Sequence, residues 1–230
     1  DTFVADRIEY DKQILKEFYQ SNGFADFRVN DVKAELAEER DGYFITFNIR
    51  EGKQFRFGKV TATSPLPEVD VAEFMAALTI KENAIYSPLD IEDDIARLER
   101  LALMNGLEFV RVVPRIDRDE GKRTLNVSFQ LERGPRLFVE RINIKGNTGT
   151  LDRVIRRYFR TAEGDPFNPR DIGQTARRLR ASGLFASVEI SSREGSSAEY
   201  VIIDVAVAEQ PTGSLSFGAS YSSAEGVGGA

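Results

Sequence analysis

The sequence predicts an α+β fold made of tandem copies of one module, in which two helices cover a three-stranded mixed sheet. Two observations carry this prediction. Three helical runs each end in a glycine and are followed by a short strand, a polar turn and a second alternating strand. These glycines are Gly23, Gly106 and Gly183. Two copies also open their second helix with a capping side chain before a proline, Ser87 before Pro88 and Asn168 before Pro169.

Each copy is predicted to run in the order strand, helix, helix, strand, strand. Segments 55–63 and 138–147 alternate apolar and polar residues, which is the period of a half-buried strand, and they form the first strand of two copies. Asp70 and Thr150 are positioned to cap the first helix of these copies. The second helices each have one apolar face. The faces consist of Ile91, Ile95 and Leu98 in one copy and of Ile172, Ala176 and Leu179 in the other.

The strand pairing follows from the lengths of the connections. The last two strands of each copy are joined by a short turn and should pair antiparallel, whereas the first strand returns through two helices and can pair parallel. The last strands, 44–49, 125–131 and 201–207, are the most apolar and are predicted to be central. The strand after the helix pair is predicted to lie at the edge, because Pro114 removes a ladder donor in one copy and 187–193 is polar in the other.

An open edge strand can accept the strand of another protein through main-chain hydrogen bonds. Because such pairing depends little on side chains, it suits a protein that handles many different clients. The alternative is an edge that is merely left bare. The residues predicted to bind client strands are Phe109, Val110, Arg111, Val112, Ser187, Val188, Glu189 and Ile190.

The composition excludes several classes of function. The 230-residue chain contains no Cys and no His, which removes disulfides, thiolate nucleophiles, the usual zinc sites and Ser/His/Asp relays. Its net charge of -6 argues against a nucleic-acid partner held by phosphate contacts. No apolar run approaches the ~20 residues that a membrane helix needs. We expect a binding scaffold with no cofactor and no catalysis.

Two other functions remain open on these residues. A carboxylate-based enzyme needs two carboxylates in one pocket, whereas the acidic residues here follow turns and helix starts. Glu92, Asp93 and Asp94, for example, are predicted to lie in the first turns of a helix, where the dipole favours negative charge, rather than to bind calcium. The strand-helix-helix order also begins the RNA-binding KH fold, but that fold needs a GxxG loop between its helices, and here Phe167 stands three residues after Gly164 in place of the second glycine.

The most specific segments resemble a known family. FVERINIKGNTGTLDRVIRRYFRTAEGDPFN, RLRASGLFASVEI and VAVAEQPTGSLSFGASYS are similar to the last polypeptide-transport-associated (POTRA) domain of a BamA-type outer-membrane β-barrel assembly factor, running into its barrel. FYQSNGFADFRV with ITFNIREGKQFRFGKV is similar to the end of the third domain entering the fourth. The resemblance covers essentially the whole chain. IKGN, EGDPFN and EQPTGSLSFG are its most specific elements.

The repeats and the resemblance together predict the domain organisation. We expect a partial third-type POTRA domain without its first strand and helix at 1–53, a fourth-type domain at 54–134 and a fifth-type domain at 135–211. We call these the first, second and third repeats. The sequence looks cut at both ends, so we expect a piece of a longer chain. Residues 212–230 are expected to begin a transmembrane β-barrel, because GSLSFGASYS alternates apolar with small polar residues. An ordinary soluble strand is the alternative.

The resemblance implies a periplasmic arm attached to an outer-membrane barrel in a Gram-negative bacterium. Such arms bind accessory outer-membrane lipoproteins and escort unfolded outer-membrane proteins to the barrel. The family's lipoprotein contact corresponds here to Arg156, Arg160 and Glu163, and its lateral barrel seam to Leu215, Phe217 and Tyr221. One departure is Gly149 in GNTGT, which predicts a looser turn. The arm of a related translocation-and-assembly barrel or two-partner secretion transporter is the alternative.

Charge is distributed unevenly among the repeats. The third repeat is the only one with more basic than acidic residues, and its arginines gather on its two predicted helices. These arginines are Arg153, Arg156, Arg157, Arg160, Arg177, Arg178 and Arg180. They predict either a solvated helix face or a docking face for an acidic partner or anionic headgroups.

Overall fold

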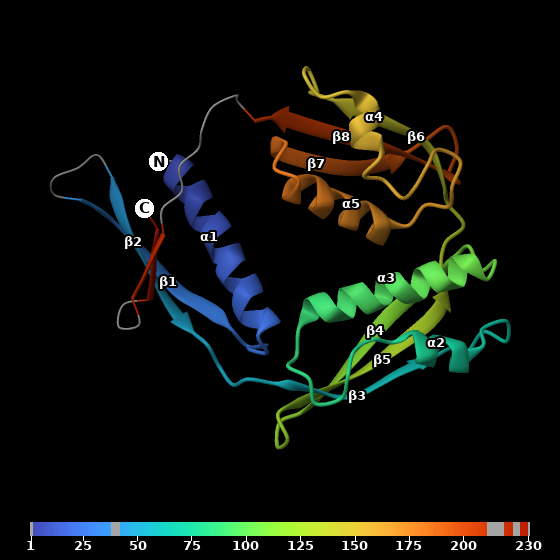
Figure 1. The fold of residues 1–230 in the computed structure, drawn as a ribbon, viewed down its shortest axis with the longest axis horizontal. Helices are drawn as coiled ribbons and strands as arrows, with labels where there is room; N and C mark the ends of the chain where they lie inside the picture. Colours follow the sequence, from blue (N-terminus) through green and yellow to red (C-terminus); the bar gives the residue numbers. More distant parts are fainter. Residues whose placement is uncertain (1, 38–41, 211–218, 223–225, 230) are drawn as a thin grey trace. The chain divides into compact units, whose positions relative to one another are not determined.

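The protein has the predicted α+β architecture, with helices packed on small sheets (Figure 1). The structure is a computed structural model, and the residues that it describes are 2–37, 42–210, 219–222 and 226–229. The chain divides into two compact units, of which the second consists, in its described part, of 99–111 and 132–210. No described helix combines the length and apolar character that crossing a membrane requires.

The first repeat contains helix α1 (Thr2–Ser21) and strands β1 (Arg28–Leu36) and β2 (Tyr43–Arg50), in the expected order of helix, strand, strand. The two strands pair antiparallel. Tyr19 of α1 stacks on Phe27, with 4.4 Å between the ring centroids. Many large apolar side chains of this repeat remain exposed, because one helix and two strands give them little to pack against. They are Tyr10, Ile14, Phe18, Leu36, Tyr43 and Phe44.

The second repeat consists of β3 (Arg56–Thr63), α2 (Val71–Ala77), α3 (Pro88–Met104), β4 (Val110–Asp119) and β5 (Thr124–Arg133). Its sheet has the order β3-β5-β4, and β3 is parallel to β5. The last strand is therefore central and the strand after the helix pair lies at an edge, as predicted. The predicted apolar face of α3 is buried.

The third repeat consists of β6 (Phe138–Lys145), α4 (Asp152–Arg156), α5 (Pro169–Ala181), β7 (Phe185–Glu194) and β8 (Tyr200–Glu209). Its sheet has the order β6-β8-β7, with β6 parallel and β7 antiparallel to β8. The topology thus repeats that of the second module. The predicted face of α5 is buried in a core formed with the inward side chains of all three strands.

The loop before the second helix pairs with the first strand in both complete repeats. The amide of Phe57 donates to the carbonyl of Ala84 at 2.8 Å, and the amide of Val139 donates to the carbonyl of Asp165 at 2.8 Å. These bonds cover the outer edge of β3 and β6 at the start of each strand. They also align the two loops residue by residue, so that positions in one repeat can be matched to positions in the other.

The capping predictions have mixed outcomes. Asn168 caps α5 as predicted, since its side chain accepts from the amide of Arg170. Asp70 stands at the N-cap position of α2, but its side chain makes no capping bond. The prediction for Thr150 is wrong, because α4 begins at Asp152 and its N-cap is Leu151. Of the caps at α2, α4 and α5, local capping chemistry was therefore a sound guide only at α5, and the cap at Ser87 stays a prediction.

In the acidic run Glu92, Asp93 and Asp94 of α3, one residue makes contacts outside its own helix. Asp94 lies in the second turn of α3 and is fully buried. Its carboxylate accepts from the amide of Thr79 at 3.0 and 3.2 Å, from Thr79 Oγ1 at 2.6 Å and from the amide of Ile80 at 3.1 Å. The expected place in the first turns of the helix is confirmed, and Asp94 in addition anchors the loop that follows α2.

The tail contains strands β9 (Ala219–Ser222) and β10 (Gly226–Gly229), which pair antiparallel. Leu215 and Phe217, two of the three expected seam residues, lie outside the described residues. Tyr221 belongs to β9, but its side chain is outside the description as well. The expectation of a barrel strand therefore stays a prediction.

Candidate functional site

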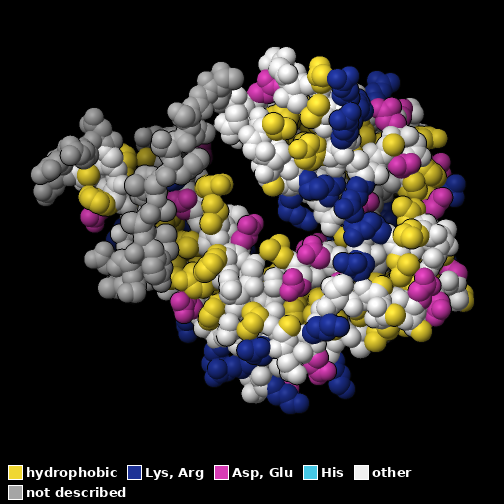
Figure 2. All heavy atoms as spheres, in the orientation of Figure 1, with side chains coloured by type: hydrophobic (Ala, Val, Ile, Leu, Met, Phe, Trp, Pro, Cys, Tyr) yellow, Lys and Arg dark blue, Asp and Glu magenta, His cyan; other side chains and the backbone are white. Residues whose placement is uncertain are grey.

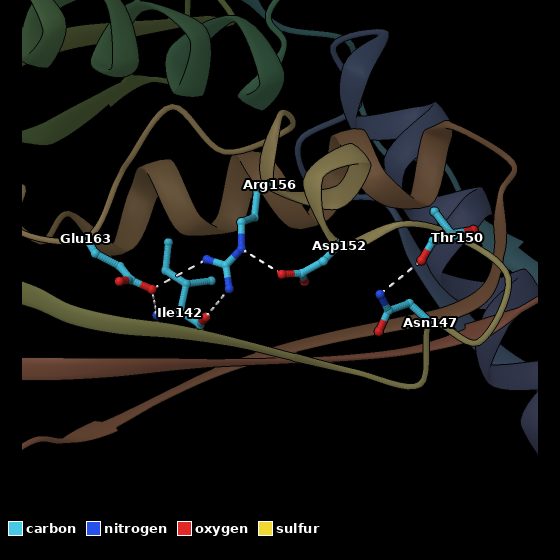
Figure 3. Close-up of polar contacts among 6 residues, drawn as sticks. All are labelled: Ile142, Asn147, Thr150, Asp152, Arg156 and Glu163. Atoms are coloured by element: carbon cyan, nitrogen blue, oxygen red, sulfur yellow. Dashed lines mark hydrogen bonds and ion pairs between the residues drawn. The ribbon is translucent and has the colours of Figure 1, made fainter.

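Arg156 and Glu163, two of the three residues expected at the lipoprotein contact, meet at the outer edge of β6 (Figure 3). Arg156 ends α4 and reaches down to the strand, where its Nη2 donates to the carbonyl of Ile142 at 2.8 Å. Its Nε donates to Asp152 Oδ2 at 3.0 Å, and its Nη1 to Glu163 Oε1 at 3.4 Å. The guanidinium is thus fixed by three acceptors from three segments of the repeat.

Glu163 completes the contact with β6. Its Oε1 accepts from the amide of Ile142 at 3.2 Å, so both backbone groups of Ile142 are bonded to side chains. An exposed sheet edge offers such unpaired groups to other chains. The pair of Arg156 and Glu163 therefore closes the middle of the β6 edge, while both side chains keep over a third of their surface exposed, 38% and 48%.

Arg160 belongs to a different group of charges. With Arg100, Arg111 and Arg178 it lies around Asp171, and these cations oppose the burial that raises the pKa of the Asp171 carboxyl. Burial, followed by the repulsion of Arg160, lowers the pKa of Arg178. The three expected lipoprotein residues thus divide between two clusters, which spacing along the sequence did not indicate.

Basic side chains gather on the face of α4 and α5 that Figure 2 presents. The net positive charge of the third repeat was expected from the sequence, and the concentration of dark blue side chains over these helices agrees with it. Some of these cations are used internally: Arg178 Nη2 donates to the carbonyl of Tyr158 at 2.9 Å. Part of this surface is therefore a self-bonded helix face, and docking of an anionic partner on the rest stays a prediction.

The edge of β7, predicted to accept client strands, is touched by an arginine of α5. Both Nε and Nη2 of Arg180 donate to the carbonyl of Val188, at 3.2 and 2.9 Å. β7 lies at the outside of its sheet, with β8 on its other side. No sequence pattern predicts this contact, because it joins an exposed helix residue to a main-chain atom of the next strand.

The start of β4, the other predicted client edge, is engaged within the second unit. The carbonyl of Phe109 accepts from the amide of Gly134 at 2.6 Å, and the ring of Phe109 meets Phe138 edge-on with centroids 5.4 Å apart. Arg111 donates to the carbonyls of Val110 and Phe167. The bond from Gly134 lies on the side of β4 that pairs with β5, whereas Arg111 occupies a carbonyl of β4 itself. Client binding at 109–112 stays a prediction.

A carboxylate that sequence reasoning missed fixes the GNTGT turn. Glu209 accepts from the amides of Gly149, at 2.9 Å to each oxygen, and Thr150, at 2.6 Å. These bonds lower the pKa of the Glu209 carboxyl, Gly149 contributing most. The expectation of a loose turn at Gly149 is therefore wrong. Because Thr150 is held in this turn, it is not available to cap α4.

Within the described part of the chain, no group of three or more acidic residues is arranged to hold a metal ion. The described edges and helix faces are built from hydrogen-bond donors, acceptors and charges. They can bind protein strands and charged surfaces, and the geometry assigns no reacting group to any of them.

Known proteins resemble the chain over nearly its whole length. The model of the family described as POTRA, surface antigen variable number repeat, matches residues 1–52, 55–134 and 137–210. Outer membrane protein assembly factor BamA of Neorickettsia risticii is 30% identical over 221 residues, which cover 96% of this chain and 29% of the relative. The BamA of Neisseria meningitidis serogroup B is 26% identical over 95% of this chain and 28% of the relative. The chain thus spans under a third of these relatives.

The fold comparison agrees with the family match. The crystal structure of Haemophilus influenzae BamA POTRA3-5 aligns with a TM-score of 0.54 and 24% identity, over 88% of this chain and 80% of that one. At this identity the likeness concerns the fold alone. It supports the arrangement of helix pairs on small mixed sheets that the sequence predicted.

Proposed function

Since the chain belongs to the POTRA family, we propose that it is the periplasmic scaffold of an outer-membrane protein assembly factor. The scaffold binds accessory lipoproteins and unfolded outer-membrane proteins, and it delivers the latter to a β-barrel for insertion into the outer membrane. The observation that carries this proposal is the match of three consecutive segments to one binding module, in a chain whose relatives are named assembly factors over almost its whole length. The proposed role involves no catalysis.

The proposal assigns different tasks to different surfaces. Lipoproteins bind at Arg156, Arg160 and Glu163, where Arg156 and Glu163 both present exposed charge. Client strands add to the outer edges of β4 and β7, and the tail from 212 onward leads into the barrel, with its seam at Leu215, Phe217 and Tyr221. The module boundaries are those expected from the repeats, 1–53, 54–134 and 135–211.

A pull-down tests the lipoprotein contact. The 230-residue chain is used to capture palmitate-labelled lipoproteins from detergent-solubilised membranes of the source organism, and Glu163→Lys is expected to reduce capture at least tenfold. Glu163→Gln separates charge from hydrogen bonding to Ile142. Glu82→Lys reverses the same charge in the matching loop of the second repeat and is the control. Equal capture by wild type and Glu163→Lys would remove this surface from the proposal.

Crosslinking tests the client edge. Ser192 lies two residues after Ile190 on β7, and the amide and carbonyl groups of both residues point away from β8. Proline at 192 therefore removes a hydrogen-bond donor of the outer edge and leaves the hydrogen bonds between β7 and β8 intact. Ser192→Pro is expected to reduce crosslinking of nascent outer-membrane proteins to residues of β7 by more than half. Undiminished crosslinking, with the circular dichroism of the variant unchanged, would contradict strand addition at this edge.

A further inference from the structure

The Arg180 contact gives the β7 edge a chemical feature that a bare sheet edge lacks. Two donors of one guanidinium converge on one main-chain oxygen, Val188 O. Since that oxygen bonds away from β8, Val188 belongs to the outward-facing set of the antiparallel ladder, and alternation places the amide and carbonyl of Ile190 in the same set. An incoming strand would need these groups. Arg180 therefore occupies a carbonyl that an added strand would use.

The charge of Arg180 is not neutralised by an acidic neighbour. Among the described residues no carboxylate pairs with Arg180, and its guanidinium donates to the Val188 carbonyl alone. Glu189, the next residue along β7, lines the same cavity as Arg180 but makes no ion pair with it. The carboxylate of Asp204 accepts hydrogen bonds from Arg193 Nε at 2.7 Å and from Asn143 Nδ2 at 3.3 Å.

A cavity of about 370 Å³ adjoins this position, with Lys145, Arg180, Glu189 and Ile190 among its lining residues. If another protein added a strand along β7, side chains of that strand would lie next to this cavity. An added strand that displaces Arg180 from the Val188 carbonyl costs the guanidinium a charge-assisted hydrogen bond. Only an acceptor on the added strand can replace that bond. A carboxylate matches both the fork geometry and the charge of Arg180.

We propose that Arg180 is a specificity residue of the β7 edge, which favours extended protein segments carrying an Asp or Glu on the side that faces α5. A neutral strand must displace Arg180 without compensation, whereas an acidic strand exchanges the Val188 carbonyl for its own carboxylate. This inference rests on the proposed function, because it concerns which client strands the edge takes.

The second repeat provides an internal contrast. The position matching Arg180 in α3 is Glu99, whose Oε1 accepts from Asn168 Nδ2 at 3.0 Å and lies 3.5 Å from Arg170 Nε. A glutamate cannot donate to a strand carbonyl. The β4 edge therefore lacks the α-helix guanidinium that β7 has, and its own arginine, Arg111, is held by the carbonyl of Phe167 as well as that of Val110.

The test uses two fluorescein-labelled peptides of alternating Thr and Val, identical except for a central Asp or Asn, with binding to the 230-residue chain measured by anisotropy. Wild type is expected to bind the Asp peptide about threefold more tightly than the Asn peptide, the scale of one exposed charge-assisted contact. In Arg180→Gln the ratio falls to about one, because the competing contact and the ionic contact are both lost. Arg177→Gln removes the same charge from an exposed position of α5 and keeps the wild-type ratio.

The outcomes separate this inference from the proposed function. A ratio near one in wild type, or a ratio that persists in Arg180→Gln, overturns the role of Arg180. If Ser192→Pro abolishes peptide binding in either of those cases, strand addition at β7 survives alone. If neither peptide binds wild type, the preference and strand addition at β7 fail together.

Discussion

The second and third repeats have the same backbone plan but different side chains along their sheet edges. Matching residues form the two cores: Phe74 of α2 and Ile155 of α4 stand at equivalent positions, and both are fully buried. One position further along, Met75 stands where the third repeat has Arg156. Met75 Sδ accepts from the amide of Ala62 on β3, whereas Arg156 donates to a carbonyl on β6.

The loops before the second helix differ in the same manner. Glu82 of the second repeat is exposed and matches Glu163, but only Glu163 bonds the first strand, through the amide of Ile142. The third repeat thus closes the middle of its β6 edge with a pair of opposite charges. The comparison teaches that apolar positions determine the module, while a few polar positions beside the sheet determine which main-chain groups of its edge are already bonded.

The anchor of the loop after the first helix offers the sharpest test of this division. Asp94→Ala is expected to lower the free energy of opening of the second repeat by about 3 kcal/mol, because the amides of Thr79 and Ile80 lose a buried charged acceptor. The matching Thr175 bonds only by its hydroxyl, to Asp171 O at 2.9 Å and Arg178 Nη2 at 3.1 Å, and Thr175→Ala should cost about 1 kcal/mol. Hydrogen exchange resolved by mass spectrometry measures both. Equal losses would contradict the comparison.

The turn after the first strand is expected to give the next largest effect. Gly146 has φ of 88°, and a Cβ there would lie 1.9 Å from the carbonyl oxygen of Val207. Gly146→Ala should therefore destabilise the third repeat by about 2 kcal/mol. Ser64 occupies the matching position and donates from Oγ to Leu131 O at 2.8 Å, so Ser64→Ala should cost about 1 kcal/mol. Segment-resolved hydrogen exchange would reveal a reversed order, which would refute the prediction.

Much of the module was predictable from the sequence, because it depends on local periodicity. The helical spacing of Ile172, Ala176 and Leu179 identified the buried face of α5, and alternation identified the central strands. The cap at Asn168 needs only its own first turn and was also predicted.

The rim of the module was not predictable in the same way, because its contacts join residues far apart in sequence. Thr150 looked like a helix cap, yet its amide is held by Glu209. Asp94 looked like part of an acidic helix start, yet it bonds the loop after α2. The resemblance supplied Arg156 and Glu163 as candidates, but only the fold showed that they meet at one strand residue.

Acidification should loosen the third repeat at the turn that Glu209 holds. Hydrogen bonds from Gly149 and Thr150 lower the pKa of Glu209 in the folded protein below its ordinary value of 4.5. The contribution of this group to stability is therefore complete above that value and is lost as the pH falls through the lower, folded pKa. Carboxyl NMR titration measures the pKa directly, and Glu209→Gln should remove the acid-dependent loss of amide protection at 149 and 150. A Glu209 pKa at its ordinary value would contradict this.

The smallest expected effect on stability comes from making the third repeat like the second at its edge. Arg156→Met gives α4 the residue that α2 has at this position, and because the lost ion pairs are largely exposed, the cost should be below about 1 kcal/mol. The change in hydrogen exchange at Ile142 should be larger than the change in the stability of the whole repeat. Without Arg156 the carbonyl of Ile142 is uncovered and Glu163 loses a neighbour, so the Ile142 amide should exchange faster while the amides of β8 stay protected. Met75→Arg is the reciprocal control, and unchanged protection at Ile142 would mean that Glu163 closes this edge alone.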